Sequence, residues 1–113
     1  MPFINVKTNI PVSENAQEAL KTRLGHAVEA LPGKSENWLM VGMEPDFRLW
    51  FQGTDAPAAM VTVNLYGSAP DDAYESLTGR ITEILAAAMD IAPDRIYVQY
   101  QETPNWGWNG GNF

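Results

Sequence analysis

Pro2 is the residue with the clearest potential for unusual chemistry, because it directly follows Met1. Loss of Met1 would leave Pro2 with a free secondary amine, whose ring fixes the direction of the nitrogen lone pair. An ordinary α-amino group has a pKa of about 7.7 to 8.0, and an apolar setting lowers that pKa by disfavouring the charged form. Such a nitrogen could accept a proton from carbon. The simpler interpretation is that Pro2 begins a strand where its missing N–H costs nothing.

A few other side chains could take part in chemistry. Lys34 follows the predicted end of a helix, in a loop where strand ends should converge, and its charge could hold an anionic group. The alternative interpretation is that Lys34 is a solvated loop lysine without a role in a site. His26 lies between apolar helix positions and is expected to face solvent. Arg95 is expected to form a structural ion pair, and the acidic pairs are interpreted as helix-start and surface charge.

Composition excludes several classes of protein. With 7 Lys and Arg against 14 Asp and Glu, the net charge of −7 would repel a nucleic-acid backbone. The absence of cysteine excludes disulfides, thiolate metal sites and a cysteine nucleophile. The first 20 residues lack the pattern of a signal peptide, and no run approaches the ~18 apolar residues of a membrane span. We therefore expect a cytoplasmic protein, with any export occurring without a signal peptide.

The elements that must position these residues come as a repeat. Residues 3–8, 39–44, 59–66 and 95–101 have the pattern of strands, and residues 14–31 and 71–89 that of amphipathic helices. Leu20 and Leu77, like the other apolar positions of the two helices, are 57 positions apart, and the same shift superposes the strands. The chain is thus predicted to be a single domain, 1–113, of the α/β (α+β) class, with βαβ repeats at about 1–57 and 58–113.

Right-handed crossovers should place both helices on one face of a four-stranded sheet. The strand positions predicted to face those helices are Ile4, Val6, Leu39, Val41, Val61, Val63, Leu65, Ile96, Val98 and Tyr100. Strand alternation sends the other side chains to the opposite face, which mixes apolar and polar groups. That composition favours packing against other copies of the chain, as a ring. In the C-terminal tail, Asn109 and Gly110 predict a hairpin.

The sequence resembles the macrophage migration inhibitory factor family of the tautomerase superfamily. The resemblance runs from MPFINVKTNIP, through Gly33-Lys34 and Leu65-Tyr66-Gly67, to IAPDRIYVQY, GWN and the final Phe113. It implies a homotrimer with a central channel, and keto-enol tautomerisation of phenylpyruvate-like 2-keto acids. The implied catalytic base is Pro2, after removal of Met1, and no metal or cofactor is implied.

The resemblance also assigns binding roles to residues of this chain. Lys34 matches the lysine that binds the substrate carboxylate, and Tyr66 matches a position whose backbone N–H also binds it. Tyr97 matches a tyrosine contributed by the adjacent subunit. Gln99 points the same way and replaces an asparagine, so its extra methylene alters its reach.

Aromatic substitutions at the pocket mouth distinguish this chain from the family pattern. Trp106 replaces a small aliphatic residue and Trp38 replaces a tyrosine, so that with Phe113 they would make the pocket more aromatic and narrower. Plain interface packing is an equally good interpretation of each tryptophan.

A second role implied by the family is that of a cytokine-like protein that binds a cell-surface receptor and retains the pocket as a binding site. The remaining, simpler interpretation is a structural trimer with a vestigial pocket.

Overall fold

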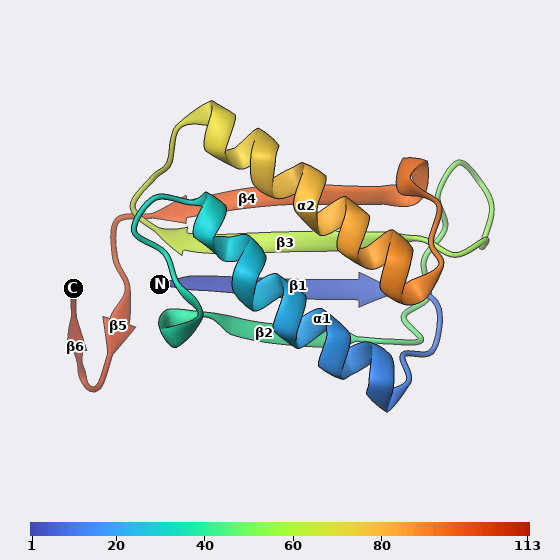
Figure 1. Ribbon diagram of the computed structural model, residues 1–113, viewed down its shortest axis with the longest axis horizontal. Coiled ribbons are helices and arrows are strands. Elements are labelled where there is room, and N and C mark those ends of the chain that lie inside the picture. Colours follow the sequence, from blue (N-terminus) through green and yellow to red (C-terminus); the bar gives the residue numbers. More distant parts are fainter.

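A four-stranded sheet covered on one face by two helices forms the body of the protein in a computed structural model that describes residues 1–113 (Figure 1). The strands are β1 (Pro2–Thr8), β2 (Met40–Glu44), β3 (Ala59–Tyr66) and β4 (Ile96–Thr103), in the spatial order β2-β1-β3-β4. β1 pairs in parallel with β2 and β3 with β4, while β1 and β3 are antiparallel. Helices α1 (Glu14–Ala27) and α2 (Asp71–Met89) link the parallel pairs. The predicted repeat of a βαβ unit is therefore confirmed.

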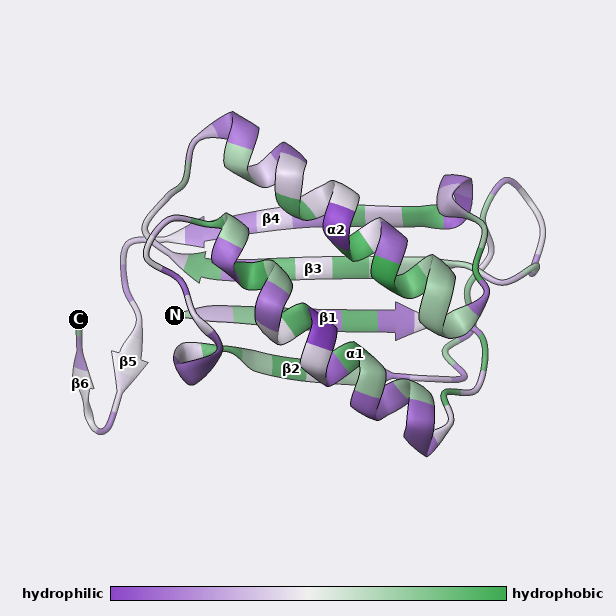
Figure 2. Cartoon of the chain, viewed as in Figure 1, coloured by the Kyte–Doolittle hydropathy of each residue, from purple (hydrophilic) through white to green (hydrophobic).

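The hydrophobic core lies between the helices and the sheet. Along β1 and β3 buried and half-buried residues alternate, as strand geometry requires of a sheet with only one face covered by helices. The helices contribute Leu20, Leu24, Leu77, Ile81 and Leu85, all fully buried. Hydrophobic and hydrophilic positions are interspersed along both helices (Figure 2), and the buried hydrophobic ones belong to the core. The ten strand residues predicted to face the helices all belong to this core or pack against it.

The helices begin where the sequence predicted. The Ser13 side chain accepts a hydrogen bond from the Ala16 N–H at 3.1 Å and so caps α1, while Asp71 and Asp72 supply acidic side chains to the first turn of α2. The predicted extension of α1 to residue 31 is wrong in its last turn. The chain tightens into a 3₁₀ turn, η1 (Val28–Ala30), which still buries Val28 against the core.

A long excursion, residues 45–57, connects β2 to β3 at the far end of the sheet from the N-terminus (Figure 1). The Arg95 guanidinium donates hydrogen bonds to the backbone carbonyls of residues 51, 54, 56 and 57, at 3.0 to 3.2 Å. The expectation that Arg95 forms an ion pair is therefore wrong, because its guanidinium group binds backbone carbonyl oxygens rather than a carboxylate. Phe51 and Thr54 exchange backbone hydrogen bonds across Gln52 and Gly53, both with positive φ, as in a type I′ turn.

The C-terminal tail forms the predicted hairpin. Strands β5 (Gly107–Trp108) and β6 (Gly111–Asn112) are joined by Asn109 and Gly110, whose φ angles of 51° and 83° fit a type I′ turn. Two more 3₁₀ turns, η2 (Glu36–Trp38) and η3 (Pro93–Arg95), precede β2 and β4. Neither α1 nor α2 is long and apolar enough to cross a membrane.

Candidate active site

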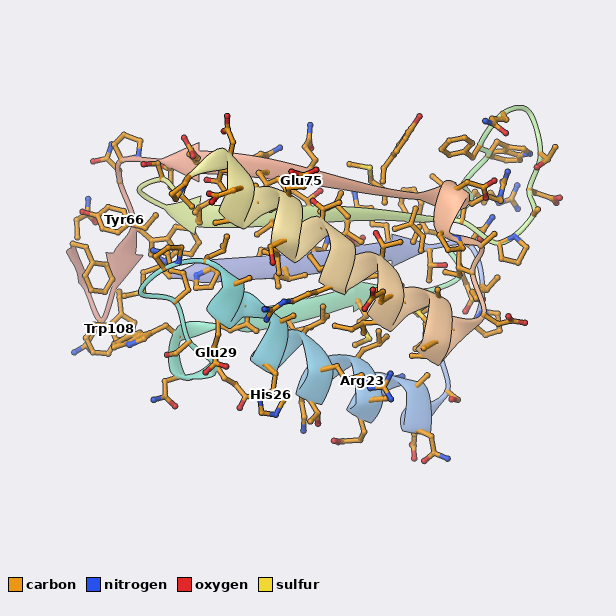
Figure 3. The ribbon with its side chains drawn as sticks, turned by 45° about the horizontal axis from the view of Figure 1, so that its top comes forward. Arg23, His26, Glu29, Tyr66, Glu75 and Trp108 are labelled. Carbon is orange, nitrogen blue, oxygen red and sulfur yellow. The ribbon has the colours of Figure 1, made fainter.

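The N-terminal end of β1 is where the segments with candidate chemistry converge. β3 and β4 end there, the loop after η1 passes beside them, and the C-terminal hairpin extends beyond the same edge (Figure 1). Figure 3 shows Tyr66 and Trp108 at this end, whereas His26 projects from α1. His26 is exposed, as predicted.

Pro2 is buried and opens β1 opposite Leu65 of β3. As the first residue of a central strand it needs no ladder hydrogen bond from its nitrogen. Met1 is attached here, so the nitrogen of Pro2 is an amide and has no basicity. The Met1 carbonyl oxygen accepts a hydrogen bond from the Tyr66 N–H at 3.3 Å. Met1 thus occupies the space directly in front of Pro2.

Lys34 reaches the same space from the loop after η1. Gly33, with φ of +76°, turns the chain, and the Lys34 side chain then donates a hydrogen bond to the Tyr66 carbonyl at 3.1 Å. Lys34 and the Tyr66 N–H therefore flank the front of Pro2. A cationic side chain and a backbone N–H so placed can together hold a carboxylate.

The amino group of Met1 reports the electrostatics of this position. Burial lowers its pKa below the ordinary value, and the adjacent positive charge of Lys34 lowers it further. Both causes disfavour a second positive charge at this place. An amine located here is consequently easier to keep neutral than one in water.

Aromatic rings surround the mouth of this site. Trp38 lies edge-on to Trp108 with ring centroids 5.0 Å apart and to Phe113 at 6.2 Å. Phe113 also packs against Tyr66, at 5.8 Å, and its N–H donates to the Trp106 carbonyl at 3.0 Å. The predicted rim residues Trp38 and Phe113 are therefore brought together with Tyr66. Trp106 contributes through its backbone, and Trp108, which was given no role from sequence, completes the cluster.

Tyr97 and Gln99 do not join this group within one chain. Both lie on the sheet face opposite the helices, where Tyr97 is 60% exposed. Tyr97 is level with Met60, which is level with Lys7, five residues along β1 from Pro2, or about 17 Å by strand rise. Gln99 is level with Asn5, three residues from Pro2. The single chain therefore carries two candidate half-sites. The Pro2 half-site lies at one end of the sheet, and the half-site of Tyr97 lies toward the other end.

Two cavities of the chain lie away from Pro2. One of about 460 Å³ lies between the start of α1 and the end of α2. Another, of about 350 Å³, is lined by residues of the 45–57 excursion. A further cavity, of about 340 Å³, lies at the end of the sheet where Pro2 is found and is lined by Gly67, Glu102, Thr103 and Pro104.

Some side chains that hold the surroundings of these half-sites in place were not predicted from the sequence. The Asn9 side chain donates to the carbonyls of residues 49, 55 and 56, and accepts from the Ala58 N–H. An asparagine directly after a strand, where such side chains bond to nearby backbone, was the available signal. Phe51 packs against Tyr97 with ring centroids 4.8 Å apart. No local pattern predicts that contact between residues so distant in sequence.

A tyrosine pair that joins α2 to β4 was likewise not singled out. Tyr74 donates to the Glu102 carboxylate, and its ring packs on that of Tyr100 at 4.4 Å. Burial, with a smaller effect of Glu102, raises the pKa of Tyr74 to about 12. Tyr74 therefore remains a hydrogen-bond donor at any physiological pH, and it anchors the end of β4 near the Pro2 half-site.

Comparison with known proteins places this geometry in a family. The family model described as macrophage migration inhibitory factor matches residues 1–113. The chain belongs to the macrophage migration inhibitory factor family. The gerbil (Meriones unguiculatus) macrophage migration inhibitory factor is 30% identical over 115 residues, which cover 100% of this chain and 99% of that one.

The chain is also similar to two further proteins. The crystal structure of Leishmania major MIF2 superposes with a TM-score of 0.94 at 31% identity, covering 100% of this chain and 97% of that one. The bovine (Bos taurus) D-dopachrome decarboxylase is 27% identical over 109 residues, which are 94% of this chain and 90% of that one. The predicted family and fold are confirmed.

Proposed function

We propose that the protein is a keto-enol tautomerase of phenylpyruvate-like 2-keto acids, with Pro2 as the general base once Met1 is removed. Membership of the macrophage migration inhibitory factor family supports two kinds of role, tautomerase and cytokine-like. The convergence of Lys34 and the Tyr66 N–H on the front of Pro2 is the observation that favours the enzyme. The bovine relative bears an enzyme's name, D-dopachrome decarboxylase, which agrees with catalysis in this family.

The Pro2 nitrogen becomes a secondary amine when Met1 is cleaved off. It then lies in the surroundings that lower the pKa of the Met1 amine, namely burial and the charge of Lys34. A neutral amine at physiological pH can act as a base. Because Pro2 is the first residue of a strand within the sheet, its ring is held in place and the lone pair has a fixed direction.

The substrate's carboxylate would bind between Lys34 and the Tyr66 N–H, in place of the Met1 carbonyl. Pro2 removes a proton from C3 of the 2-keto acid, the C3–H electron pair forms the C2–C3 double bond, and the carbonyl π electrons move to the C2 oxygen. The protonated Pro2 then delivers the proton to that oxygen. Atoms and charge balance without a co-reactant, and the amine is regenerated. Lys34 neutralises the carboxylate, so that two negative charges need not share the site.

A homotrimer would complete the site. Tyr97 and Gln99 are too far from Pro2 of their own chain, so they would serve the neighbouring copy, with Gln99 able to hydrogen-bond a ring substituent. Exposed aromatic residues gather at both ends of the sheet: Trp38, Trp108 and Phe113 near Pro2, and Phe47, Trp50 and Tyr97 at the other end. Contact between the Pro2 end of one copy and the Tyr97 end of the next is a heterologous contact. Such contacts form a closed ring when the rotation that relates successive copies returns to the first copy. Trp38, Trp106 and Phe113 would then line the pocket around an aromatic substrate.

The enzyme proposal is tested by an ultraviolet assay of phenylpyruvate enolisation. Wild type with Met1 removed, Pro2→Gly, and a form that retains Met1 are compared after mass spectrometry has verified each N-terminus. We expect the form that retains Met1, whose Pro2 nitrogen is an amide, to lose two or more orders of magnitude, since general-base catalysis contributes about 10²- to 10⁴-fold. Pro2→Gly keeps a primary amine but loses the ring that fixes the direction of the lone pair, so its loss should be smaller. Equal rates in all three would remove the claim that Pro2 is the base.

A cytokine-like role is the second candidate, supported by the name of the gerbil relative, macrophage migration inhibitory factor. In that role the protein binds a cell-surface receptor, and the pocket serves as a binding site. Titration of the protein onto receptor-bearing host cells, with wild type and Pro2→Gly in parallel, separates the two roles. Saturable binding that persists in Pro2→Gly supports signalling independent of catalysis. Absence of saturable binding for both forms argues against it.

A further inference from the structure

Two stacked side chains, Phe51 and Arg95, support Tyr97 at the end of the sheet remote from Pro2. The Phe51 ring packs against the Tyr97 ring with centroids 4.8 Å apart and planes inclined by 49°. The Arg95 guanidinium also lies on Phe51, 5.3 Å from the ring centroid. Phe51 is half-buried, whereas Tyr97 is 60% exposed, so the contact with Phe51 covers a ring that is otherwise largely free.

The excursion that carries Phe51 is held by side chains from outside it. Arg95 donates to four of its carbonyls, including that of Phe51 at 3.2 Å. Asn9, from the other side, donates to the carbonyls of residues 49, 55 and 56. With the type I′ turn at Gln52 and Gly53, these contacts define the position of Phe51 although the segment has almost no regular secondary structure. A fixed Phe51 restricts the orientations open to Tyr97.

We infer that Phe51 is a positioning residue that holds Tyr97 in the orientation required by the active site of the neighbouring copy. This inference rests on the proposed function, in which Tyr97 of one chain completes the Pro2 half-site of the next. Phe51 acts through Tyr97 rather than by touching substrate. The 45–57 excursion is thereby part of the catalytic assembly, and its clamp by Arg95 and Asn9 has a functional purpose beyond stability.

The first test is the kinetics of Phe51→Leu, which removes the ring and keeps an apolar side chain. Because Tyr97 is assigned to substrate binding, we expect KM for phenylpyruvate to rise about 2- to 12-fold with kcat nearly unchanged. This range is the fold-change that corresponds to the interaction energy of one aromatic pair. Phe51→Tyr, which keeps the ring, should retain the wild-type KM. Phe47→Leu is the matched control once sedimentation has verified that it assembles as wild type does, because Phe47 lies in the same excursion and its ring faces Lys7 at 5.1 Å rather than Tyr97.

The second test asks whether Phe51 acts across the boundary between copies. Subunits that retain Met1 have an intact Phe51 but only an amide nitrogen at Pro2, and Phe51→Leu subunits with Met1 removed retain the Pro2 amine. Equal amounts are unfolded, mixed and reassembled, so that about a quarter of the sites pair an intact Pro2 with an intact Phe51 of the next copy. If Phe51 acted only within its own chain, the rate of the mixed sample at low substrate would be half that of Phe51→Leu alone. We expect a higher rate, because the newly paired sites are intact.

The outcomes separate this inference from the proposed function. A wild-type KM in Phe51→Leu, or a mixed sample at half the Phe51→Leu rate, overturns the inference while the loss of activity in the form that retains Met1 still supports the tautomerase. A form that retains Met1 and is as active as the wild type overturns the proposed function, and this inference with it. If sedimentation shows that Phe51→Leu does not assemble as wild type does, Phe51→Met replaces it in both tests with the same expected results.

Discussion

Replacement of Lys34 by methionine removes a positive charge from the proposed site and keeps a side chain of similar length. Lys34 is half-buried, and its nitrogen lies 3.1 Å from the Tyr66 carbonyl, beside the N–H that would hold the substrate carboxylate. The variant should therefore leave the fold intact and remove one charge-assisted hydrogen bond to substrate. Lys21→Met is the matched control, since Lys21 is an exposed lysine on α1 that pairs with Glu18 at 3.0 Å.

The size of the effect follows from the kind of hydrogen bond that the variant removes. A hydrogen bond to a charged group contributes about 1.5 to 3 kcal/mol, which corresponds to roughly 10- to 150-fold in kcat/KM. Because Lys34 is only half-buried, water screens part of its charge, so we expect the lower half of that range. The assay is phenylpyruvate enolisation over a range of substrate concentrations, after circular dichroism has verified that the variant is folded.

The pH profile of the same variant gives an independent readout. The base must be neutral, so kcat/KM rises with pH through the pKa of the Pro2 amine and then levels. Lys34 lowers the pKa of an amine at this end of the chain, second to burial. Without Lys34 the acidic limb of the profile should therefore move to higher pH, while burial still acts. In Lys21→Met the limb should stay where it is.

One combination of results would refute this reasoning. If Lys34→Met loses less than twofold in kcat/KM and its acidic limb does not move, Lys34 neither binds the carboxylate nor influences the base. A limb that moves to lower pH would contradict the electrostatic account even if activity fell.

Three further changes test other parts of the structure. Trp38→Ala removes edge-on contacts with Trp108 and Phe113, so kcat/KM for phenylpyruvate should fall about 2- to 12-fold, and more than for an aliphatic 2-keto acid; equal losses would mean that Trp38 does not contact the substrate ring. Leu77→Ala opens a cavity in the fully buried core and should lower the free energy of unfolding in urea by about 2 to 5 kcal/mol; a loss under 1 kcal/mol would contradict the packing described. Between pH 10 and 12 the unfolded chain loses tyrosine protons that the folded chain keeps at Tyr74, so stability should fall as pH rises. Thermal unfolding followed by circular dichroism should show a shallower fall in Tyr74→Phe, and an unchanged slope would speak against the raised pKa.

Local features of the fold could be predicted from the sequence because they are periodic. The spacing of apolar residues located both helices and all four strands of the sheet, and residues 59–66 and 71–89 coincide with β3 and α2. Turn chemistry located the hairpin at Asn109 and Gly110. The errors are also local: a helix and a 3₁₀ turn share nearly the same apolar spacing, so the end of α1 was placed too late.

The sequence by itself determined the repeat, the faces of the sheet, the family and the candidate base, since each depends on spacing along the chain. Only the tertiary structure decided which distant groups meet. It brought Lys34 to the backbone of Tyr66, directed Arg95 to carbonyl oxygens instead of a carboxylate, and packed Phe51 on Tyr97. It also separated Tyr97 from Pro2 by most of the length of a strand. The physical reason is that these contacts depend on how the chain closes over tens of residues, which no short-range period encodes.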